Sequence, residues 1–502
     1  MSEEQSLREI RLEKLARLRE LGADPYGVER FDVDGSAQAL LEGFEEGKTV
    51  SFAGRIISMR LMGKAAFAHI SDGDGRIQGY FKKDDLGETP WEAFRLLDIG
   101  DHIGVTGELF TTRTGEKSIH VRTIVPLSKS LQTLPLGKEK DGQQWYGLTD
   151  VQERYRHRHL DLVCNPEARK MLLDRSRIVS AVRNFFDSRG YLEVETPMLQ
   201  MHAGGAAART FATHYNAYDV DVELRISLEL YLKRIICGDV PKVYEIGRVF
   251  RNEGVSNRHN PEFTLLEWYE AYANLENVME TVEDLFRSAC TEVFGSTTVH
   301  GLDFSKPWQR VDLLGAIEKQ CGLTADDLSS LEKAKAALGK REVVNPTTGK
   351  RIKAEDEQHL GGLIEKLLEV FVEPTLQEPT FIVGYPIETS PLAKKDPARA
   401  GFTRRFEGYV LGREVCNAFS EINDPQDQRE RFEQQVRERA KGDAEAHPMD
   451  EEFLFALEGG MPPTGGCGIG IDRLAMLLTG AEHLREVLLF PMMKPVDPEE
   501  ED

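Results

Sequence analysis

The sequence contains only six cysteines in 502 residues, and no two of them form a Cys-x-x-Cys pair. This scarcity argues against a disulfide framework and a zinc ribbon, and it favours reduced thiols in the cytosol. No run approaches the roughly 20 consecutive apolar residues of a membrane span, and the N-terminal stretch lacks the apolar core of a signal peptide. We therefore expect a cytoplasmic protein without a membrane partner.

The sequence also has fewer basic than acidic residues. The chain has 63 Lys and Arg against 85 Asp and Glu, which gives a formal net charge of −22. This balance disfavours indiscriminate binding of polyanions, although a nucleic acid could still dock on a local basic patch. With 40% hydrophobic and 29% charged residues the chain can bury large cores, which excludes global disorder, and its length predicts two to four domains.

The pattern of residues changes along the chain and predicts four segments. Residues 1–49 are expected to form an N-terminal helical segment, because apolar residues recur at helical spacing. Residues 50–134 carry about five short β-rich runs separated by turn clusters, which suggests a barrel of the OB type. Residues 135–149 have the polarity of a linker. Mixed helix and strand patterns fill residues 150–502, with a mainly helical stretch at about 275–375 that resembles an insertion in a sheet domain.

The most informative stretch is residues 243–272, in which two strand-like runs flank a polar loop. Because side chains alternate along a strand, the second run places an aromatic ring, a carboxylate and a phenol on one face. That combination favours a cleft, in which the ring offers a stacking platform and the carboxylate an acidic wall. The alternative is a hairpin on the surface with a solvated turn. This face carries Phe263, Leu265, Glu267 and Tyr269. The loop adds polar groups, several of them able to bind phosphate, at Arg251, Glu253, Arg258, His259 and Asn260.

The second stretch is residues 405–424, in which a hairpin brings glutamates together. Glu407 and Glu414 lie across a predicted turn, and two such carboxylates suit Mg²⁺, which prefers oxygen ligands. The pair alone is weak evidence, because most glutamate pairs are simply exposed to solvent. The following strand places three more side chains on one face: Asn417, Phe419 and Glu421.

Two further stretches are weak signals by themselves. Residues 464–478 have the pattern of a glycine-rich strand that leads into a helix with Arg473 in its first turn, which would allow close backbone approach and would favour anions. They are neither a P-loop nor a Rossmann motif, because no Gly-Lys-[Ser/Thr] and no βαβ unit follows. The strand-like residues 191–199 precede a Gly/Ala loop. Glu229 lies in a run whose pattern predicts a strand that leads into a helix, and a single glutamate at such a place is usually a surface residue.

Taken together and in this order, these stretches resemble the three signature motifs of class II aminoacyl-tRNA synthetases. The runs FRNEGVSNRHNPEFTLLEWYEAY, GREVCNAFSEINDPQDQRERF and GGCGIGIDRLAMLL closely follow the bacterial lysyl-tRNA synthetases, and the likeness spans about residues 50–495. It implies an α+β chain, with an N-terminal OB-fold β-barrel that binds the anticodon and a class II catalytic domain whose antiparallel β-sheet is flanked by helices. It also implies a homodimer that converts L-lysine and ATP to lysyl-adenylate and transfers the lysyl group to the 3′-hydroxyl of tRNA(Lys).

The resemblance assigns roles to particular residues, with no protein nucleophile among them. For L-lysine it implies Glu229, Glu267 and Tyr269 at the side-chain ammonium, and Gly205, Asn417 and Glu421 at the backbone groups. For ATP it implies Arg251, Glu253, His259, Asn260, Phe263, Glu407 and Arg473, of which Arg251 and Arg473 are catalytic. The implied Mg²⁺ ligands are Glu407 and Glu414. The implied anticodon contacts are Arg60, Phe67, Gln78 and Glu116.

Several alternatives stay open at this point. A related enzyme for aspartate or asparagine would make poor use of the acidic pair Glu229 and Glu267, because those substrates carry no cationic side chain. A paralogue that lysylates a protein would be expected to lack the anticodon domain. A non-catalytic RNA-binding scaffold would not need the phosphate and metal residues. For Phe67 the residues alone leave a barrel-core position equally open, and Trp268, on the opposite strand face, is expected to pack in the core.

Overall fold

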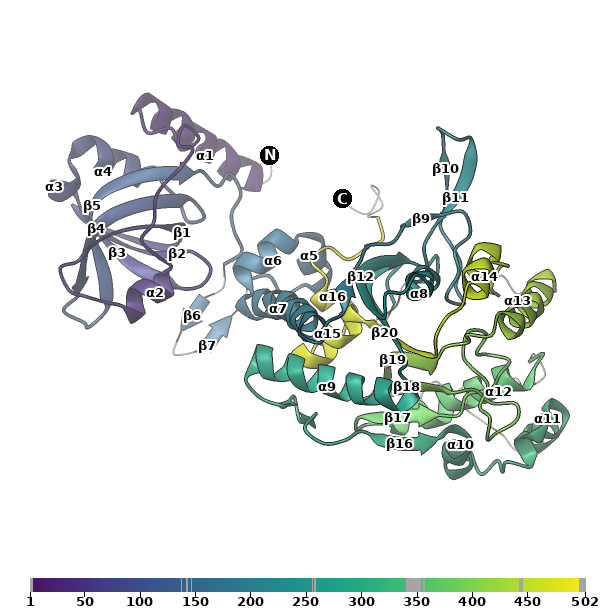
Figure 1. Ribbon diagram of the computed structural model, residues 1–502. Coiled ribbons are helices and arrows are strands. Elements are labelled where there is room, and N and C mark those ends of the chain that lie inside the picture. Colours follow the sequence, from purple (N-terminus) through teal and green to yellow (C-terminus); the bar gives the residue numbers. More distant parts are fainter. Residues whose placement is uncertain are drawn as a thin grey trace. The chain divides into compact units, whose positions relative to one another are not determined.

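The computed structural model describes residues 3–136, 138–140, 143–145, 147–254, 256, 259–339, 354, 357–441 and 446–495. The chain divides into two compact units, Met1–Arg169 and Lys170–Asp502 (Figure 1). The expected linker at 135–149 lies partly outside the described residues, and its described part includes a two-stranded hairpin of β6 (Lys138–Lys140) and β7 (Gln143–Trp145). The domain boundary expected at residue 150 stays a prediction.

The first unit contains the closed five-stranded barrel that the sequence predicts, with strand order β1-β2-β3-β5-β4. Four of its strand pairs are antiparallel, and β3 and β5 pair in parallel. Burial alternates along β2, so that Ala66 and Ala68 enter the barrel core while Phe67 between them is only half-buried. The strands are β1 (Thr49–Met62), β2 (Ala65–Ser71), β3 (Arg76–Lys82), β4 (His102–Thr111) and β5 (Lys117–Ser128).

The first unit also contains helices. Helix α1 contributes Leu18 to the barrel core, while its Arg11 donates to the carbonyl of Ser130 at 2.8 Å and its Lys14 pairs with Asp98 at 2.5 Å. Arg11 and Lys14 therefore help to hold this helix in the first unit. The helices are α1 (Glu3–Glu20), α2 (Ala37–Glu42), α3 (Lys83–Leu86), α4 (Glu88–Arg95), α5 (Val151–Arg156) and α6 (Arg158–Cys164).

The second unit is built on an eight-stranded sheet with the order β16-β17-β18-β19-β20-β13-β12-β8. Its neighbours are antiparallel except for the parallel pairs β16–β17 and β12–β8 at the two edges. The strands are β8 (Leu192–Glu193), β12 (Lys242–Phe250), β13 (Glu262–Ala271), β16 (Gln309–Asp312), β17 (Thr380–Val383), β18 (Arg405–Val410), β19 (Arg413–Ser420) and β20 (Thr464–Gly470).

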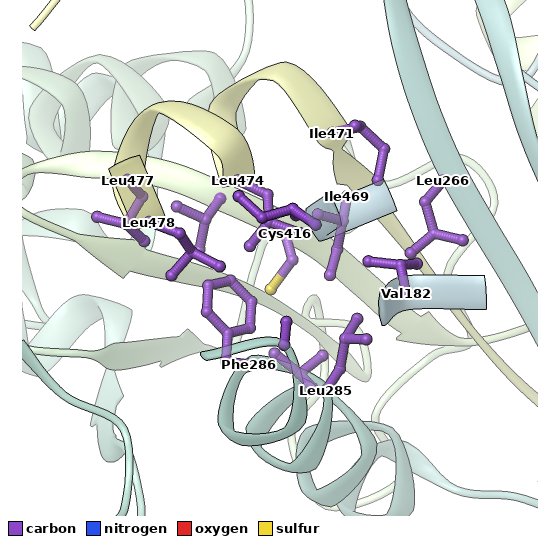
Figure 2. Packing of buried hydrophobic residues seen from close by; sticks show 14 of the residues in the cluster. Val182, Leu266, Leu285, Phe286, Cys416, Ile469, Ile471, Leu474, Leu477 and Leu478 are labelled. Carbon is purple, nitrogen blue, oxygen red and sulfur yellow. The ribbon is translucent and has the colours of Figure 1, made fainter. Parts of the chain in front are cut away.

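One face of this sheet packs against helices α7 (Pro166–Ser188), α9 (Leu275–Phe294) and α15 (Ile471–Thr479). Figure 2 shows Val182 of α7, Phe286 of α9 and Leu474 of α15 packed around Cys416 and Ile469 of the sheet. Trp268 belongs to the same core and is 1% exposed, as the alternation along β13 predicts. The other face of β13 carries Phe263, Leu265, Glu267 and Tyr269.

The opposite face carries α8 (Glu229–Cys237), α13 (Pro425–Ala440) and α14 (Glu451–Glu458), whose apolar residues form a separate core with β12 and β13. A third core joins helices α10, α11 and α12 to β17 and β18. The remaining helical elements are α10 (Leu313–Cys321), a 3₁₀ turn (Asp327–Ser329), α11 (Leu331–Gly339), α12 (Leu360–Leu367), a π turn (Leu368–Val372), a second 3₁₀ turn (Glu373–Thr375) and α16 (Leu484–Val487).

Two stretches differ in detail from the expectations. The stretch 275–375, expected to be mainly helical, contains helices but also includes β14 (Thr298–Val299), β15 (Leu302–Asp303) and β16, and β16 joins the main sheet. Its residues 340–353, 355 and 356 lie outside the described part of the chain. The strand expected at 191–199 is divided into β8 and β9, because β8 pairs with β12 whereas β9 joins a separate small sheet. That sheet consists of β9 (Leu199–Gln200), β10 (Ala212–Tyr215) and β11 (Val220–Leu224). Among the described helices, none is long and apolar enough to cross a membrane.

Candidate active site

A cavity of about 310 Å³ lies on the face of the main sheet opposite α7 and α9, over β13, β20 and β19. The strand register places Glu267, Gly468 and Asn417 in one row across these three strands. A Cβ atom added to Gly466 would lie 2.4 Å from Oε1 of Glu421. The glycine-rich run therefore forms a floor without side chains, and this absence creates the hollow between the side chains of β13 and β19.

Three buried carboxylates, those of Glu229, Glu267 and Glu421, line one end of the cavity. Glu267 accepts hydrogen bonds from the Ser227 hydroxyl at 2.8 Å and the Tyr269 hydroxyl at 3.1 Å. Burial and then the neighbouring Glu229 raise the pKa of Glu267 to about 7. This end of the cavity is acidic, water-poor and suited to a cationic ligand.

A lysine of the chain itself lies among these carboxylates. Lys233 stands one helical turn after Glu229 on α8, is fully buried, and its ammonium pairs with both Glu229 and Glu421. The rings of Phe419 and Phe453 lie 5.3 and 5.9 Å from its nitrogen. The sequence analysis missed this residue, although its i,i+4 spacing from Glu229 was a signal.

Gly205 and Asn417 line the same end. Gly205 has a φ of +91°, and its N–H donates to Nε2 of His447 at 2.8 Å. Burial lowers the pKa of His447 to about 4, so its ring is neutral at neutral pH. Asn417 accepts a hydrogen bond from Nε of Arg405 at 3.1 Å, which fixes its amide. His447 was also missed, because nothing near it in the sequence marks it.

At the other end of the cavity, arginines lie near an aromatic ring. The guanidinium of Arg251, just after β12, lies 5.1 Å from the centre of the Phe263 ring. Its Nε is buried and has no hydrogen-bond partner among the described residues, so it offers a donor to an anion. Arg473, in the first turn of α15, donates to Glu414 at 2.9 Å and lies 3.4 Å from Nε2 of His259.

The loop between β12 and β13 completes this end of the cavity with Glu253 and Asn260. The Asn260 amide donates to the carbonyl of Glu262 at 2.7 Å, while its buried Oδ1 has no partner among the described residues. Arg258 of the same loop lies outside the described residues. The cavity thus brings together every residue expected to bind lysine or ATP except Glu407.

Glu407 is buried, and it is not among the described residues that line the cavity. Its carboxylate accepts hydrogen bonds from Arg405 and from the hydroxyls of Tyr385 and Tyr409. These contacts occupy both of its oxygens. The expected role of Glu407 at ATP and Mg²⁺ therefore stays a prediction, and a metal there would have to share the carboxylate with its present partners.

The surroundings of Glu414 nevertheless fit a divalent cation in charge and ligand type. Glu414 lies on the cavity wall, and burial followed by the charges of Glu407 and Glu414 raises the pKa of Glu373 to about 7. Such crowding of carboxylates is relieved by a hard cation, which prefers oxygen ligands. Within the described part of the chain, no three His, Cys, Asp or Glu side chains could hold a metal by themselves, so any metal there would need ligands from substrate or water.

The barrel unit brings the four expected anticodon residues to one face. Arg60 of β1 pairs directly opposite Phe67 of β2, and the amide of Gln78 donates to Glu116 at 2.7 Å. The sequence analysis missed Tyr80, whose ring lies 4.9 Å from that of Phe67. Tyr80 lies two residues after Gln78, and this spacing could have identified it. The ring row continues from Tyr80 to Phe110 and His120, at 6.0 and 5.3 Å.

Comparison with known proteins adds to this geometry. The model of a family described as tRNA synthetases class II (D, K and N) matches residues 150–494, and that of an OB-fold nucleic acid binding domain matches residues 50–127. A protein named lysine–tRNA ligase from Syntrophomonas wolfei is 51% identical over 495 residues, which cover 97% of each chain. Proteins of the same name from Thermoanaerobacter sp. and Moorella thermoacetica are 50% and 48% identical, over 97% and 98% of this chain and 95% and 98% of theirs.

Proposed function

The chain belongs to the class II tRNA synthetases (D, K and N), and on that premise we propose that its cavity activates L-lysine with ATP and that the enzyme is a lysine–tRNA ligase. In the first step the lysine carboxylate attacks the α-phosphorus of ATP, which forms lysyl-adenylate and releases pyrophosphate. In the second step the terminal 3′-hydroxyl of tRNA(Lys) takes the lysyl group and AMP leaves.

The charge of the cavity is the observation that carries this proposal. Glu229, Glu267 and Glu421 are buried around it, against one buried ammonium, that of Lys233. A surplus of buried negative charge is costly unless a cationic ligand neutralises it. A lysine substrate brings such a charge on its side chain, whereas aspartate and asparagine bring none, which weakens the rival assignment within the family.

The nucleotide would occupy the end of the cavity with the arginines. Arg251, with an unpartnered buried Nε, would bind the α-phosphate, and Phe263 would stack on the adenine ring. Arg473 would cover the other face of the ring and reach the γ-phosphate. Asn260, His259 and Glu253 would hold the adenine edge and the phosphates. The protein then accelerates the reaction by orienting two substrates and by neutralising phosphate charge.

We include Mg²⁺ in this proposal, with Glu414 and, subject to its present hydrogen bonds, Glu407 as ligands. Bound there beside the phosphates, the ion would neutralise charge on ATP. Glu414 also accepts a hydrogen bond from Arg473, which would keep that arginine beside the phosphates. Two features support this part of the proposal: carboxylates are crowded around Glu414, and their oxygen atoms are the type of ligand that Mg²⁺ prefers.

The barrel face would bind the anticodon of tRNA(Lys). Phe67 and Tyr80 offer rings for stacking, and Arg60, Gln78 and Glu116 offer polar contacts. The presence of this barrel argues against a paralogue that lysylates proteins, because such an enzyme has no anticodon to bind. We place the enzyme in the cytoplasm, because its six cysteines are unpaired and thiols stay reduced in that compartment.

We also propose a homodimer. The segment after α7 exposes apolar side chains that a second copy could cover, among them Leu192 at 53% and Met201 at 56% exposure. Met198 and Leu199 lie between them and are also exposed. Sedimentation or light scattering of the purified protein tests this part of the proposal.

Pyrophosphate exchange with each of the twenty amino acids tests the assignment. We expect exchange with lysine to exceed that with every other amino acid. Preferential activation of aspartate, asparagine or any uncharged amino acid would overturn it. Charging of tRNA(Lys) against a tRNA with another anticodon then tests the role of the barrel.

A further inference from the structure

Lys233 pairs with two carboxylates of the cavity without lining the cavity itself. It extends from α8, its side chain is 0% exposed, and its ammonium lies between Glu229 of the same helix and Glu421, just after β19. The rings of Tyr269 and Phe419 lie 5.8 and 5.3 Å from the nitrogen. Burial acts to lower the pKa of Lys233, but Glu229 and Glu421 raise it, so the ammonium stays charged.

The pairing orients Glu421. Lys233 pairs with its Oε2, and its Oε1 lies over the glycine floor, where a Cβ at Gly466 would be 2.4 Å away. That Oε1 is buried and has no hydrogen-bond partner among the described residues. A buried carboxylate oxygen without a donor is rare in folded proteins unless a ligand supplies one. Lys233 thus leaves Oε1 of Glu421 directed at the space that a substrate would fill.

The charges also match one class of substrate. Three carboxylates and one internal ammonium leave two uncompensated negative charges at this end of the cavity when all are ionised. Lysine carries two ammonium groups, whereas a neutral amino acid carries one. Its carboxylate would face the arginines at the other end. With Lys233 in place, the acidic end of the cavity therefore has a surplus of two negative charges, which the two ammonium groups of a diamino acid would neutralise.

We propose that Lys233 is a positioning and specificity-determining residue, a built-in counter-ion that orients Glu229 and Glu421 and tunes the cavity to an amino acid with two ammonium groups. This inference rests on the proposed function and deepens it. Without Lys233, three buried carboxylates would face one another. Burial raises the pKa values of Glu229 and Glu421, and Lys233 acts to lower both. Without Lys233 both pKa values would rise further, and a substrate ammonium would have to displace more protons.

Other charged and titratable groups surround this cluster. On α8 itself they are Glu229 and Cys237. From the elements packed against it they are Glu267 and Tyr269 on β13, Arg405 on β18, Glu421 after β19 and His447 before α14. His447 stays neutral above pH 6 and Arg405 stays charged, so the glutamates are the groups that change their protonation when Lys233 is lost.

The test compares Lys233→Met, which keeps length but removes the charge, with Lys233→Arg, which keeps the charge. Pyrophosphate exchange on the full-length protein gives KM for lysine and for ATP between pH 6.5 and 8.5. We expect Lys233→Met to raise KM for lysine by about tenfold or more at pH 7, to change KM for ATP less than about twofold, and to recover partly at pH 8.5. Lys233→Arg should retain the pH profile of the unsubstituted protein. Lys242→Met removes an exposed partner of Glu270 and serves as the matched control.

The proposal is overturned if Lys233→Met lowers exchange equally at every pH, or raises both KM values together, because both results indicate general damage. If this variant does not fold, the pair Lys233→Met with Glu421→Gln removes both charges. A folded double variant whose KM for lysine exceeds that of Glu421→Gln alone supports the counter-ion. A KM equal to that of Glu421→Gln, or a double variant that also fails to fold, overturns it. Absence of lysine-dependent exchange in the unsubstituted protein would instead refute the proposed function.

Discussion

Nε2 of His447 accepts a hydrogen bond from the main-chain N–H of Gly205 at 2.8 Å, across 242 positions of sequence. Gly205 is held at a φ of +91°, where a Cβ would lie 2.7 Å from the Ser227 hydroxyl. His447 comes from the segment before α14 and stacks on Phe432, with ring centres 5.6 Å apart. The bond therefore ties two segments that are remote in sequence, at the acidic end of the cavity, and it engages the Gly205 N–H.

This bond predicts a role for His447 in lysine binding. Replacement by Leu removes the acceptor, and we expect KM for lysine to rise about five- to tenfold, since a buried hydrogen bond contributes about 1–1.5 kcal/mol. Replacement by Gln, whose Oε1 can reach the same donor, should recover most of the affinity. The measurement is pyrophosphate exchange at varied lysine. Equal KM values for the Leu and Gln variants would show that the hydrogen bond is unimportant.

Glu267→Gln should weaken lysine activation far more than ATP binding. Loss of one carboxylate from a desolvated charge pair costs about 3–5 kcal/mol, which corresponds to a loss of at least a hundredfold in kcat/KM for lysine. Glu270→Gln on the same strand, where Glu270 pairs with the exposed Lys242, is the control and should have little effect. Comparable losses in the KM values for lysine and ATP would contradict the ammonium role of Glu267.

The raised pKa of Glu267 predicts a pH dependence of lysine binding. Because burial and Glu229 raise this pKa to about 7, the carboxyl carries a proton in part of the free enzyme below pH 7. An ammonium pairs with the carboxylate form, so binding at low pH must release that proton. As the pH falls below 7, we expect KM for lysine to increase more and more steeply, up to about tenfold for each pH unit, while KM for ATP stays nearly constant. In Glu267→Gln this rise should disappear, and its persistence would assign the titration to another group.

Phe67→Ala should slow tRNA charging and leave lysine-dependent pyrophosphate exchange intact. Stacking of a base on an aromatic ring contributes about 1–3 kcal/mol, so the KM for tRNA should rise about tenfold or more. Phe81→Ala is the contrasting variant, because Phe81 is fully buried against Phe94 in the barrel core and its loss should cost about 3–5 kcal/mol of stability. A similar fall in melting temperature for both variants would identify Phe67 as a core residue.

Glu414→Gln should raise the Mg²⁺ concentration needed for half-maximal exchange. Mutation of a residue that only supports a metal ligand lowers metal affinity roughly 10-fold or more, and we expect the loss of a direct ligand to lower it by at least as much. The variant also weakens the contact to Arg473, so Arg473→Lys is the comparison that leaves the carboxylate in place. Chelation of Mg²⁺ should abolish exchange in the unsubstituted protein. An unchanged Mg²⁺ requirement in Glu414→Gln would remove Glu414 from the metal site.

Much of the candidate site could be predicted from the sequence because it lies on strands. Along β13 the two-residue alternation sends Glu267 and Tyr269 to the cavity and Leu266 and Trp268 to the core, as expected. Gly190 lies two residues after the end of α7 with a φ of +77°, a left-handed conformation that glycine adopts readily at the end of a helix. In the barrel, the same alternation separates the half-buried Phe67 from its buried neighbours.

Other features could not be predicted, because they depend on partners that are distant in sequence. Glu407 has the spacing expected of a metal ligand, but Tyr385 and Arg405 bind its carboxylate in the folded protein. The register of β19 and β20 decides that glycines form the floor between β13 and β19. A hydrophobicity pattern contains neither the pairing of strands nor the partner of a buried carboxylate.

The sequence by itself determined the barrel, the sheet domain and the set of residue types that a lysine and a nucleotide require, because periodicity and motif order are properties of the chain alone. Only the tertiary structure decided which charges meet. Lys233 and His447 gain their importance from Glu421 and Gly205, which lie far away in sequence. Burial removes the water that would otherwise screen these groups, and their energies are therefore set by the neighbours that folding provides.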